Sequence, residues 1–194
     1  MLSLPMPESI PTERLLLQRL RYEDAEEIFY AYASKPEATR FVSWPTHNTV
    51  DDTRRYLVYA FQAWNYGTDY SYSIRLPNNL LVGSIGIVNE NGKAQVGYII
   101  SPVHWGRGYA TEACRAILRV LSAIEGIYRI GSFVDAENLA SIRVLEKCGM
   151  YAEARLADWF RFVNQGNKPK ECVLFRYVPH ADAQETATIL QRPF

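Results

Sequence analysis

The sequence predicts a single mixed α/β domain, in which an antiparallel meander is joined to a parallel crossover and helices cover both faces of the sheet. Two patterns support this prediction. Strand-like runs separated by short turn signals occupy the middle of the chain, and strand and helix periodicities alternate in its second half. The length of 194 residues fits one domain, so we assign residues 1–194 to it.

The first third of the chain predicts one strand and two helices. The strand is expected over residues 15–20, followed by a helix over residues 23–34 that Pro36 ends. A second helix is expected over residues 49–64, with Thr49 as its N-cap. Its apolar stripe is predicted to consist of Leu57, Ala60, Phe61 and Trp64.

The middle third predicts three antiparallel strands, over residues 70–76, 80–88 and 93–100. The turn Pro77-Asn78-Asn79 separates the first two strands, and the pair Asn91-Gly92 joins the second to the third. An Asn-Gly pair between strand-like runs is a strong hairpin signal, because both residues tolerate positive φ. This part of the chain is therefore expected to form the meander.

The last third alternates between helical and strand patterns. A helix is expected over residues 110–124 with Gly126 as its C-cap, and another over residues 139–147 that Gly149 ends. The remaining strands are expected over residues 128–134 and 172–178. A strand, a helix and a further strand in succession predict a parallel crossover beside the meander.

Composition excludes several classes of function. Lysine and arginine together number 21, as do aspartate and glutamate, so no basic footprint for nucleic acid is present. The first 11 residues lack a basic side chain, and no apolar run approaches the roughly 20 residues that cross a bilayer. We therefore expect a cytoplasmic protein without a membrane segment. Buried thiols are expected, rather than a disulfide framework, a metal site or a catalytic cysteine, at Cys114, Cys148 and Cys172.

A loop with two glycines lies between the expected strand 93–100 and the expected helix 110–124. Gly106 and Gly108 allow unusual backbone angles and a close approach to a ligand. The helix that follows offers unpaired N–H groups at its positive end, and Arg107 could add a side-chain contact. This arrangement predicts a pyrophosphate site; the alternative is a glycine turn that only caps the helix. The third glycine of a dinucleotide fingerprint and the Gly-Lys-Ser/Thr of a P-loop are missing.

This loop resembles the coenzyme-A loop of the GNAT superfamily of N-acetyltransferases, whose motif is Gln/Arg-x-x-Gly-x-Gly/Ala. Trp105 departs from the motif at its first place, but Trp-Gly-(basic)-Gly-Tyr-Ala-Thr-Glu-Ala is the version favoured by the Rim-type subfamily. That subfamily includes enzymes that acetylate the N-terminal residues of ribosomal proteins. Residues 12–17 resemble its opening strand, and residues 138–150 resemble its Asn-x-x-Ser-x-x-(apolar)-(apolar)-Glu-Lys-x-Gly-Phe helix. The resemblance covers about residues 10–178 and leaves residues 180–194 unassigned.

The resemblance implies direct transfer of an acetyl group from acetyl-CoA, without a metal. Acetyl-CoA would lie across a splay between two parallel strands, here residues 95–101 and 128–134. A backbone N–H at the end of the first strand would stabilise the developing oxyanion. Asn138 would contact the pantetheine arm, although a simple N-cap also explains it. The implied acetyl-CoA-binding residues are Ile99, Ile100, Ser101, Trp105, Gly106, Arg107, Gly108, Tyr109, Ala110, Thr111, Asn138 and Ser141.

Ser141 is implied as the catalytic acid. Many superfamily members place a tyrosine one turn further along the helix, where this chain has Leu145, which cannot donate a proton. Rim-type enzymes use the serine that matches Ser141, so we expect it to hydrogen-bond the departing sulfur; the alternative is an ordinary helix serine. The identity of the general base is left open, because Gln95 occupies a position at which family members often have a carboxylate. The candidates are Glu90, Glu153, Asp158 and His104.

The acceptor is expected to be the α-amine of a protein or peptide. An α-amine has a pKa near 7.7–8.0 and a lysine near 10.4, so the α-amine loses its proton more easily if no strong base is present. The alternatives are a small amine, such as a polyamine, an amino sugar or an antibiotic, and a non-catalytic acyl-CoA sensor. A homodimer is compatible with the high aromatic content. Aromatic side chains of residues 41–47, the second helix and residues 157–167 could line an acceptor groove or belong to the core: Trp44, His47, Tyr56, Tyr59, Trp64, Trp159 and Phe160.

Overall fold

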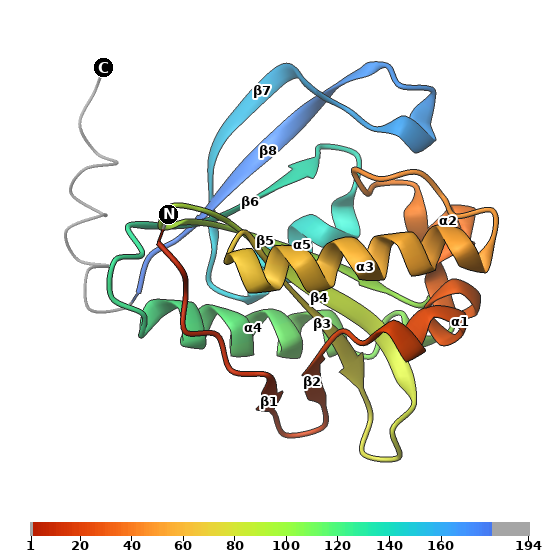
Figure 1. Ribbon diagram of the computed structural model, residues 1–194. Coiled ribbons are helices and arrows are strands. Elements are labelled where there is room, and N and C mark those ends of the chain that lie inside the picture. The colour runs from red at the N-terminus through yellow and green to blue at the C-terminus, as the bar shows by residue number, and fades with distance from the viewer. Residues whose placement is uncertain (1, 180–194) are drawn as a thin grey trace, which may run out of the picture.

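A computed structural model describes residues 2–179, and the unassigned tail at 180–194 lies outside the described residues. Eight strands of this part form one mixed sheet in the order β1-β2-β3-β4-β5-β6-β8-β7 (Figure 1). The strands are β1 (Ser9–Pro11), β2 (Leu16–Arg19), β3 (Asp69–Arg75), β4 (Leu81–Glu90), β5 (Lys93–Ile100), β6 (Arg129–Asp135), β7 (Tyr151–Arg161) and β8 (Pro169–Tyr177). Neighbouring strands are antiparallel except β5 and β6, which are parallel. The predicted meander and crossover are confirmed.

Helices cover both faces of this sheet, as predicted. They are η1 (Tyr22–Asp24), α1 (Ala25–Ile28), η2 (Phe29–Ala33), α2 (Pro36–Thr39), α3 (Val50–Tyr66), η3 (Pro102–His104), α4 (Tyr109–Ser122), α5 (Leu139–Lys147) and η4 (Val163–Gln165). One core cluster joins α4 and α5 to the sheet, and a second joins α1, η2 and α3 to its opposite face. No helix within residues 2–179 is long and apolar enough to cross a membrane.

The helix that begins after Thr49 follows its local sequence closely. The Thr49 hydroxyl accepts the N–H of Asp52, whose carboxylate accepts the N–H of Thr49 in return, so both ends of a capping box are present. The predicted apolar stripe is wrong at one place. Phe61 is 58% exposed and lies beneath the guanidinium of Arg19, whereas Ala63 is buried. The buried positions of this helix are Thr53, Leu57, Ala60 and Ala63, and Phe61 lies outside this stripe because residues two apart point about 200° apart on a helix.

Three other predictions differ from the structure. Pro36 does not simply end the first helix but begins α2, because its missing N–H has no partner to lose at a first helical position. Gly126 lies beyond the end of α4, whose C-cap is Ala123. The edge strands β1 and β7 were not predicted; β7 is largely solvent-exposed, so its residues show little apolar alternation. Figure 1 shows β7 and β8 as a long hairpin beyond the rest of the sheet.

The parallel pairing of β5 with β6 is short. It covers only Lys93, Ala94 and Gln95 of β5, although that strand continues to Ile100. β6 also continues, to Asp135, and pairs with β8 along this length. The two strands therefore separate after Gln95 and leave a gap between their carboxyl ends, as the expected splay requires.

A buried ion pair joins the first helical segment to the end of β3. Arg75 is 2% exposed and its Nη2 lies 3.0 Å from Oδ1 of Asp24, which is 4% exposed. Its Nη1 lies 2.9 Å from Oε2 of Glu27 and donates to the carbonyl oxygen of Asn79. Because each charge has been removed from water, the loss of one partner leaves the other uncompensated.

Replacing Arg75 with methionine should lower the free energy of unfolding by about 3–5 kcal/mol, because the buried Asp24 carboxylate then keeps only the half-exposed Arg21, at 3.4 Å, as a cation. Arg54→Met is the matched control, since Arg54 is 38% exposed in its pair with Asp51 and such pairs contribute about 0–1 kcal/mol. Urea denaturation of both variants measures the difference. Equal losses would show that Arg75 does not hold the helix to the sheet.

Candidate functional site

The gap between β5 and β6 exposes backbone groups that no strand uses. The N–H of Ser101 donates to the carbonyl oxygen of Val82 in β4. Because backbone groups alternate along a strand, the N–H groups of Ile99 and Gly97 also face β4, and those of Ile100 and Tyr98 face the gap. Of the three residues expected to offer backbone groups there, Ile99 and Ser101 are engaged with β4. Ile100 alone turns its N–H toward the gap.

The loop before α4 has the conformation that its glycines predict. Gly106 and Gly108 have φ values of 75° and 81°, in the left-handed region that side chains disfavour. Gly108 is the residue before α4, and Glu112 is the first whose N–H bonds back along the helix, to the Gly108 carbonyl. Within the described part of the chain, no backbone N–H from residue 106 to 111 has a hydrogen-bond partner. Arg107, Tyr109, Ala110 and Thr111 thus surround a set of free donors that fits a pyrophosphate.

Trp105, which departs from the expected motif, connects this loop to the gap. Its indole N–H donates to the carbonyl oxygen of Ile100 over 2.8 Å. The bond occupies the Ile100 carbonyl and holds the start of the loop against the end of β5. The loop with the free N–H groups therefore begins directly at the end of β5, where the Ile100 N–H faces the gap.

Glu112 ties the same loop to the segment before β2. Its Oε1 accepts the Thr12 hydroxyl at 2.7 Å and the Arg14 backbone N–H at 2.8 Å, and its Oε2 accepts the Arg14 Nε–H at 2.7 Å. Arg14 also donates to the Arg107 carbonyl and lies over the Tyr109 ring. Residues 12–17 and the loop before α4, two of the segments that carry the family resemblance, are thus in contact with each other.

These contacts change the acidity of Glu112. Partial burial would raise the pKa of this carboxyl, but the hydrogen bonds from Thr12 and Arg14 outweigh burial and lower it below the usual 4.5. A carboxylate with a lowered pKa contributes its full stabilisation at pH values at which it is ionised in both the folded and the unfolded state. Its contribution is lost as the pH falls through the folded-state pKa.

Ser141 lies at the start of α5, beside the gap. Asn138 is the N-cap of this helix, as predicted, and its Oδ1 accepts the Ser141 N–H at 3.2 Å. The Ser141 hydroxyl lies 2.7 Å from the hydroxyl of Tyr98, which also donates to the Ser141 carbonyl at 3.2 Å. Leu145, one turn further on, is fully buried.

Tyr98 was not identified from the sequence. Burial raises the pKa of its hydroxyl well above 10, with a smaller opposing effect from Ser141, so the group stays protonated at neutral pH. A tyrosine in a strand is usually explained by packing, and its partner here is 43 residues away in the chain. The Gly97-Tyr98 pair beside the predicted gap was the available signal.

Two of the proposed bases are committed to ion pairs. Glu153 bonds to Arg129, which lowers the pKa of its carboxyl, and it lies 3.9 Å from Arg176. Glu90 lies 2.8 Å from Lys93, at the far end of the β4–β5 hairpin from Ile100. A carboxylate held by a cation is a poor proton acceptor, so neither fits the role.

The other two candidates have no ion-pair partner among residues 2–179. Asp158 has a φ of 51° at an irregularity of β7, where the register with β8 shifts. His104 lines a hollow of about 580 Å³ between η2, β4 and the η3 turn, and its Nδ1 is buried without a described partner. Burial, reinforced by Arg107, lowers the pKa of His104. Its ring lies near Tyr109, with centroids 6.3 Å apart.

The segments expected to form an acceptor groove do meet. Asn164 in the β7–β8 connection donates to the carbonyls of Thr39 and Trp44 and accepts the N–H of Thr46, which fastens that connection to residues 41–47. The His47 ring packs 5.0 Å from Trp44, and burial lowers its pKa. Trp64 belongs to the core instead, against Tyr70 and Tyr72, while Tyr59 and Trp159 are exposed.

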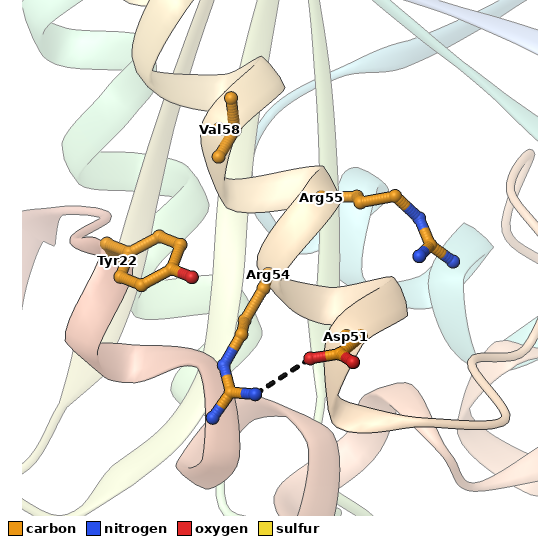
Figure 2. A pocket seen from close by; sticks show the side chains of 5 residues that line it. All are labelled: Tyr22, Asp51, Arg54, Arg55 and Val58. Carbon is orange, nitrogen blue, oxygen red and sulfur yellow. Dashed lines mark hydrogen bonds and ion pairs between the residues drawn. The ribbon is translucent and has the colours of Figure 1, made fainter.

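A separate shallow pocket of about 380 Å³ contains none of the implied acetyl-CoA residues. It is lined by Tyr22, Asp51, Arg54, Arg55 and Val58 (Figure 2). Arg54 and Asp51 point toward each other and bond at 2.7 Å. Residues 2–179 hold no group of three or more His, Cys, Asp and Glu side chains that could bind a metal. The gap and its adjoining loop are therefore the candidate site.

Replacing Glu112 with glutamine should lower the free energy of unfolding at pH 7 by about 1–3 kcal/mol, through the loss of charged hydrogen bonds. The difference from the wild type should shrink as the pH falls below about 4.5, where the Glu112 carboxylate begins to protonate. Chemical denaturation from pH 3 to 8 measures both effects. The exposed Glu125→Gln is the control, and a difference that does not vary with pH would contradict the assigned role.

Known proteins share this arrangement. The acetyltransferase (GNAT) domain family matches residues 14–151. An uncharacterised N-acetyltransferase, p20, of Bacillus licheniformis is 30% identical over 78% of this chain and 87% of its own. The spermidine N(1)-acetyltransferase of Escherichia coli K12 is 26% identical over 58% of this chain and 61% of its own.

Solved structures agree in fold. An acetyltransferase from Bacillus anthracis superposes with a TM-score of 0.75 at 25% identity, over 88% of this chain and 98% of its own. Mycobacterium smegmatis RimJ, solved with a CoA-disulfide, superposes with a TM-score of 0.81 at 18% identity, over 97% of both chains. From the family match, the relatives and the geometry of the gap and loop, we conclude that this chain belongs to the GNAT family of acetyltransferases.

Proposed function

We propose that this protein transfers the acetyl group of acetyl-CoA to the α-amine of a protein or peptide N-terminus, by direct attack on the thioester. The observation that carries the proposal is the gap between β5 and β6, which opens beside a loop of free N–H groups. An extended pantetheine arm can pair with a strand edge, and a pyrophosphate can sit on a helix N-terminus. Here the loop with the free N–H groups begins directly at the end of β5.

Each part of acetyl-CoA has candidate partners in the site. The N–H groups of residues 106–111 would hold the pyrophosphate, with Arg107 exposed beside them. The Ile100 and Tyr98 N–H groups would face the pantetheine arm and the acetyl carbonyl, where a fixed donor stabilises the oxyanion that forms during attack. The Asn138 side chain would flank the pantetheine while it caps α5.

Ser141 would supply the proton that the leaving group needs. When the amine nitrogen bonds to the acetyl carbon, the carbon–sulfur bond breaks and coenzyme A leaves as a thiolate. Ser141 would give its hydroxyl proton to that sulfur, while the Tyr98 hydroxyl turns its own proton from the Ser141 carbonyl to the Ser141 oxygen. The proton that the attacking nitrogen loses as the amide forms would then restore the Ser141 hydroxyl. Tyr98 is suited to this positioning role because burial keeps it protonated.

The pairing of the carboxylates that could bind a polycation favours an α-amine over a polycation. Asp51 pairs with Arg54, Asp52 with Arg55, and Glu90 with Lys93, so these carboxylates do not form a free acidic groove. An α-amine is also the easier nucleophile, because its pKa lies about 2.5 units below that of lysine. The similarity to a spermidine acetyltransferase supports a second candidate, a small amine acceptor.

A cytoplasmic location is part of the proposal. All three cysteines are free and buried. Such thiols fit a reducing compartment, whereas proteins of oxidising compartments commonly join their cysteines in disulfides. Acetyl-CoA would be the donor substrate in that compartment.

Wild-type protein should release coenzyme-A thiol from acetyl-CoA with N-terminal peptides of ribosomal proteins, and less with polyamines or amino sugars. Gly108→Trp should abolish release, because a side chain at a φ of 81° distorts the loop and covers its free N–H groups. Arg119→Trp, exposed on the same helix, is the control and should keep wild-type activity. Release with small amines alone would overturn the proposed acceptor. Binding of acetyl-CoA without release by any amine would indicate a sensor.

Ser141→Ala should lower kcat by about 100-fold, the lower range for loss of a general acid, and leave the KM for acetyl-CoA almost unchanged. Tyr98→Phe should lower kcat by about 10-fold, because it removes one hydrogen bond of about 1.4 kcal/mol. Steady-state kinetics on the preferred acceptor measure both. Ser122→Ala is the control, since that hydroxyl bonds only to the Leu118 carbonyl within α4. If Ser141→Ala retains the wild-type maximal rate, the assigned role is wrong.

A further inference from the structure

Asp69, the first residue of β3, is a partly buried carboxylate without an ion-pair partner among residues 2–179. The Ser71 hydroxyl donates to its Oδ1 over 2.7 Å. The Tyr56 hydroxyl of α3 donates in turn to the Ser71 oxygen over 3.3 Å. A chain of three polar groups therefore runs from α3 onto the sheet. The carboxylate at its end pairs with no cation among residues 2–179.

The strand register places this chain of groups on the face of the sheet that α3 covers. Ser71 lies opposite Gly86 of β4, which lies opposite Gly97 of β5. Tyr98, the next residue of β5, projects to the other face and meets Ser141 of α5. The two faces of the gap thus carry different chemistry. One has a hydroxyl pair for a leaving group, and the other has the Asp69 carboxylate, which lies on β3, two strands from β5.

Two glycines, Gly97 and Gly86, leave the sheet surface between the gap and Asp69 without side chains. A Cβ on Gly97 would meet no atom within 4 Å. A Cβ on Gly86 would lie 3.3 Å from the Ser71 hydroxyl oxygen and 3.9 Å from Oδ1 of Asp69. A side chain at Gly86 would crowd the Ser71 hydroxyl, and a side chain at Gly97 would fill the open space beside it on β5. Their absence lets a group that enters over Gly97, just past the last paired residue Gln95, approach the Ser71 hydroxyl.

We propose that Asp69, acting through the Ser71 hydroxyl, takes the proton that the acceptor's ammonium group must lose before it attacks the thioester. This inference rests on the proposed function. The ammonium gives a proton to the Ser71 oxygen as that hydroxyl passes its own proton to the Asp69 carboxylate. The products are a neutral amine and a carboxylic acid, and the neutral amine then forms the bond to the acetyl carbon.

The surroundings of Asp69 suit a proton acceptor. The titratable groups that face it are Tyr56 and Tyr59 of α3, and β4 presents only Val88 and Gly86. Burial raises the pKa of the Asp69 carboxyl, against a smaller lowering by the Ser71 hydrogen bond. A carboxylate with a raised pKa binds a proton more readily near neutral pH. Burial also raises the pKa of Tyr56 to about 12, so this hydroxyl remains a donor that orients Ser71.

The test compares Asp69→Asn and Ser71→Ala with the wild type over pH 6 to 9.5, by thiol release with the preferred peptide acceptor. At pH 7 both variants should lose about 100-fold in kcat/KM. The deficit should shrink above about pH 8, because an α-amine is then largely neutral without help. Asp51→Asn, which removes an exposed carboxylate paired with Arg54, is the matched control and should follow the wild-type profile.

Acetyl-CoA affinity and melting temperature separate this role from a structural one, since neither should change. An Asp69→Asn deficit that is the same at every pH would overturn the inference, as would wild-type activity in either variant. If Asp69→Asn melts at a lower temperature, the pH dependence of the kcat/KM deficit of Ser71→Ala decides between the catalytic and the structural role. Wild-type protein that releases no thiol with any amine would overturn the proposed function as well, so the two failures are distinguishable.

Discussion

The geometry of the site depends on the early end of the parallel pairing between β5 and β6. β4 holds β5 on one side and β8 holds β6 on the other along most of their length, whereas the pairing between β5 and β6 ends at Gln95. Two parallel strands that separate leave backbone N–H and C=O groups that need partners. A ligand with an extended polar arm would satisfy these groups, which is the physical basis for proposing this gap as the acetyl-CoA site.

Long-range contacts hold the edges of this gap in place. Glu112 joins the loop before α4 to Thr12 and Arg14, near the start of the chain. Trp105 fixes the same loop to the end of β5. On the acceptor side, Asn164 fastens the β7–β8 connection to residues 41–47. Each contact uses a polar side-chain group, a carboxylate, an indole N–H or an amide, to join segments that backbone pairing leaves apart.

The alternation of side chains along β5 divides the chemistry between the two faces of the sheet. Tyr98 reaches Ser141 on the α5 side, whereas Gly97 opens toward Ser71 and Asp69 on the α3 side. Proton donation to a leaving thiolate and proton removal from an amine need groups of opposite protonation state. In the proposed mechanism these two steps are assigned to groups on opposite faces of β5.

Local sequence determined the elements that depend on neighbours in the chain. The Thr49 cap, the Asn91-Gly92 hairpin and the helix from Leu139 to Lys147 form as predicted, because caps and turns act over a few residues. The glycine loop before α4 and its family resemblance also followed from the sequence alone. The exposed strand β7 did not, since an edge that faces water shows no apolar alternation.

Tertiary structure decided which polar side chains share the site. Tyr98 meets Ser141 across 43 residues, and Tyr56 meets Ser71 from another element, so no pattern in the chain distinguishes these residues from packing or surface groups. It also removed Glu90 and Glu153 from the candidate bases, by pairing each with a cation. A sequence shows which groups can accept or donate a proton. Only the fold shows which are left free to do so, because burial and partners depend on contacts far apart in the chain.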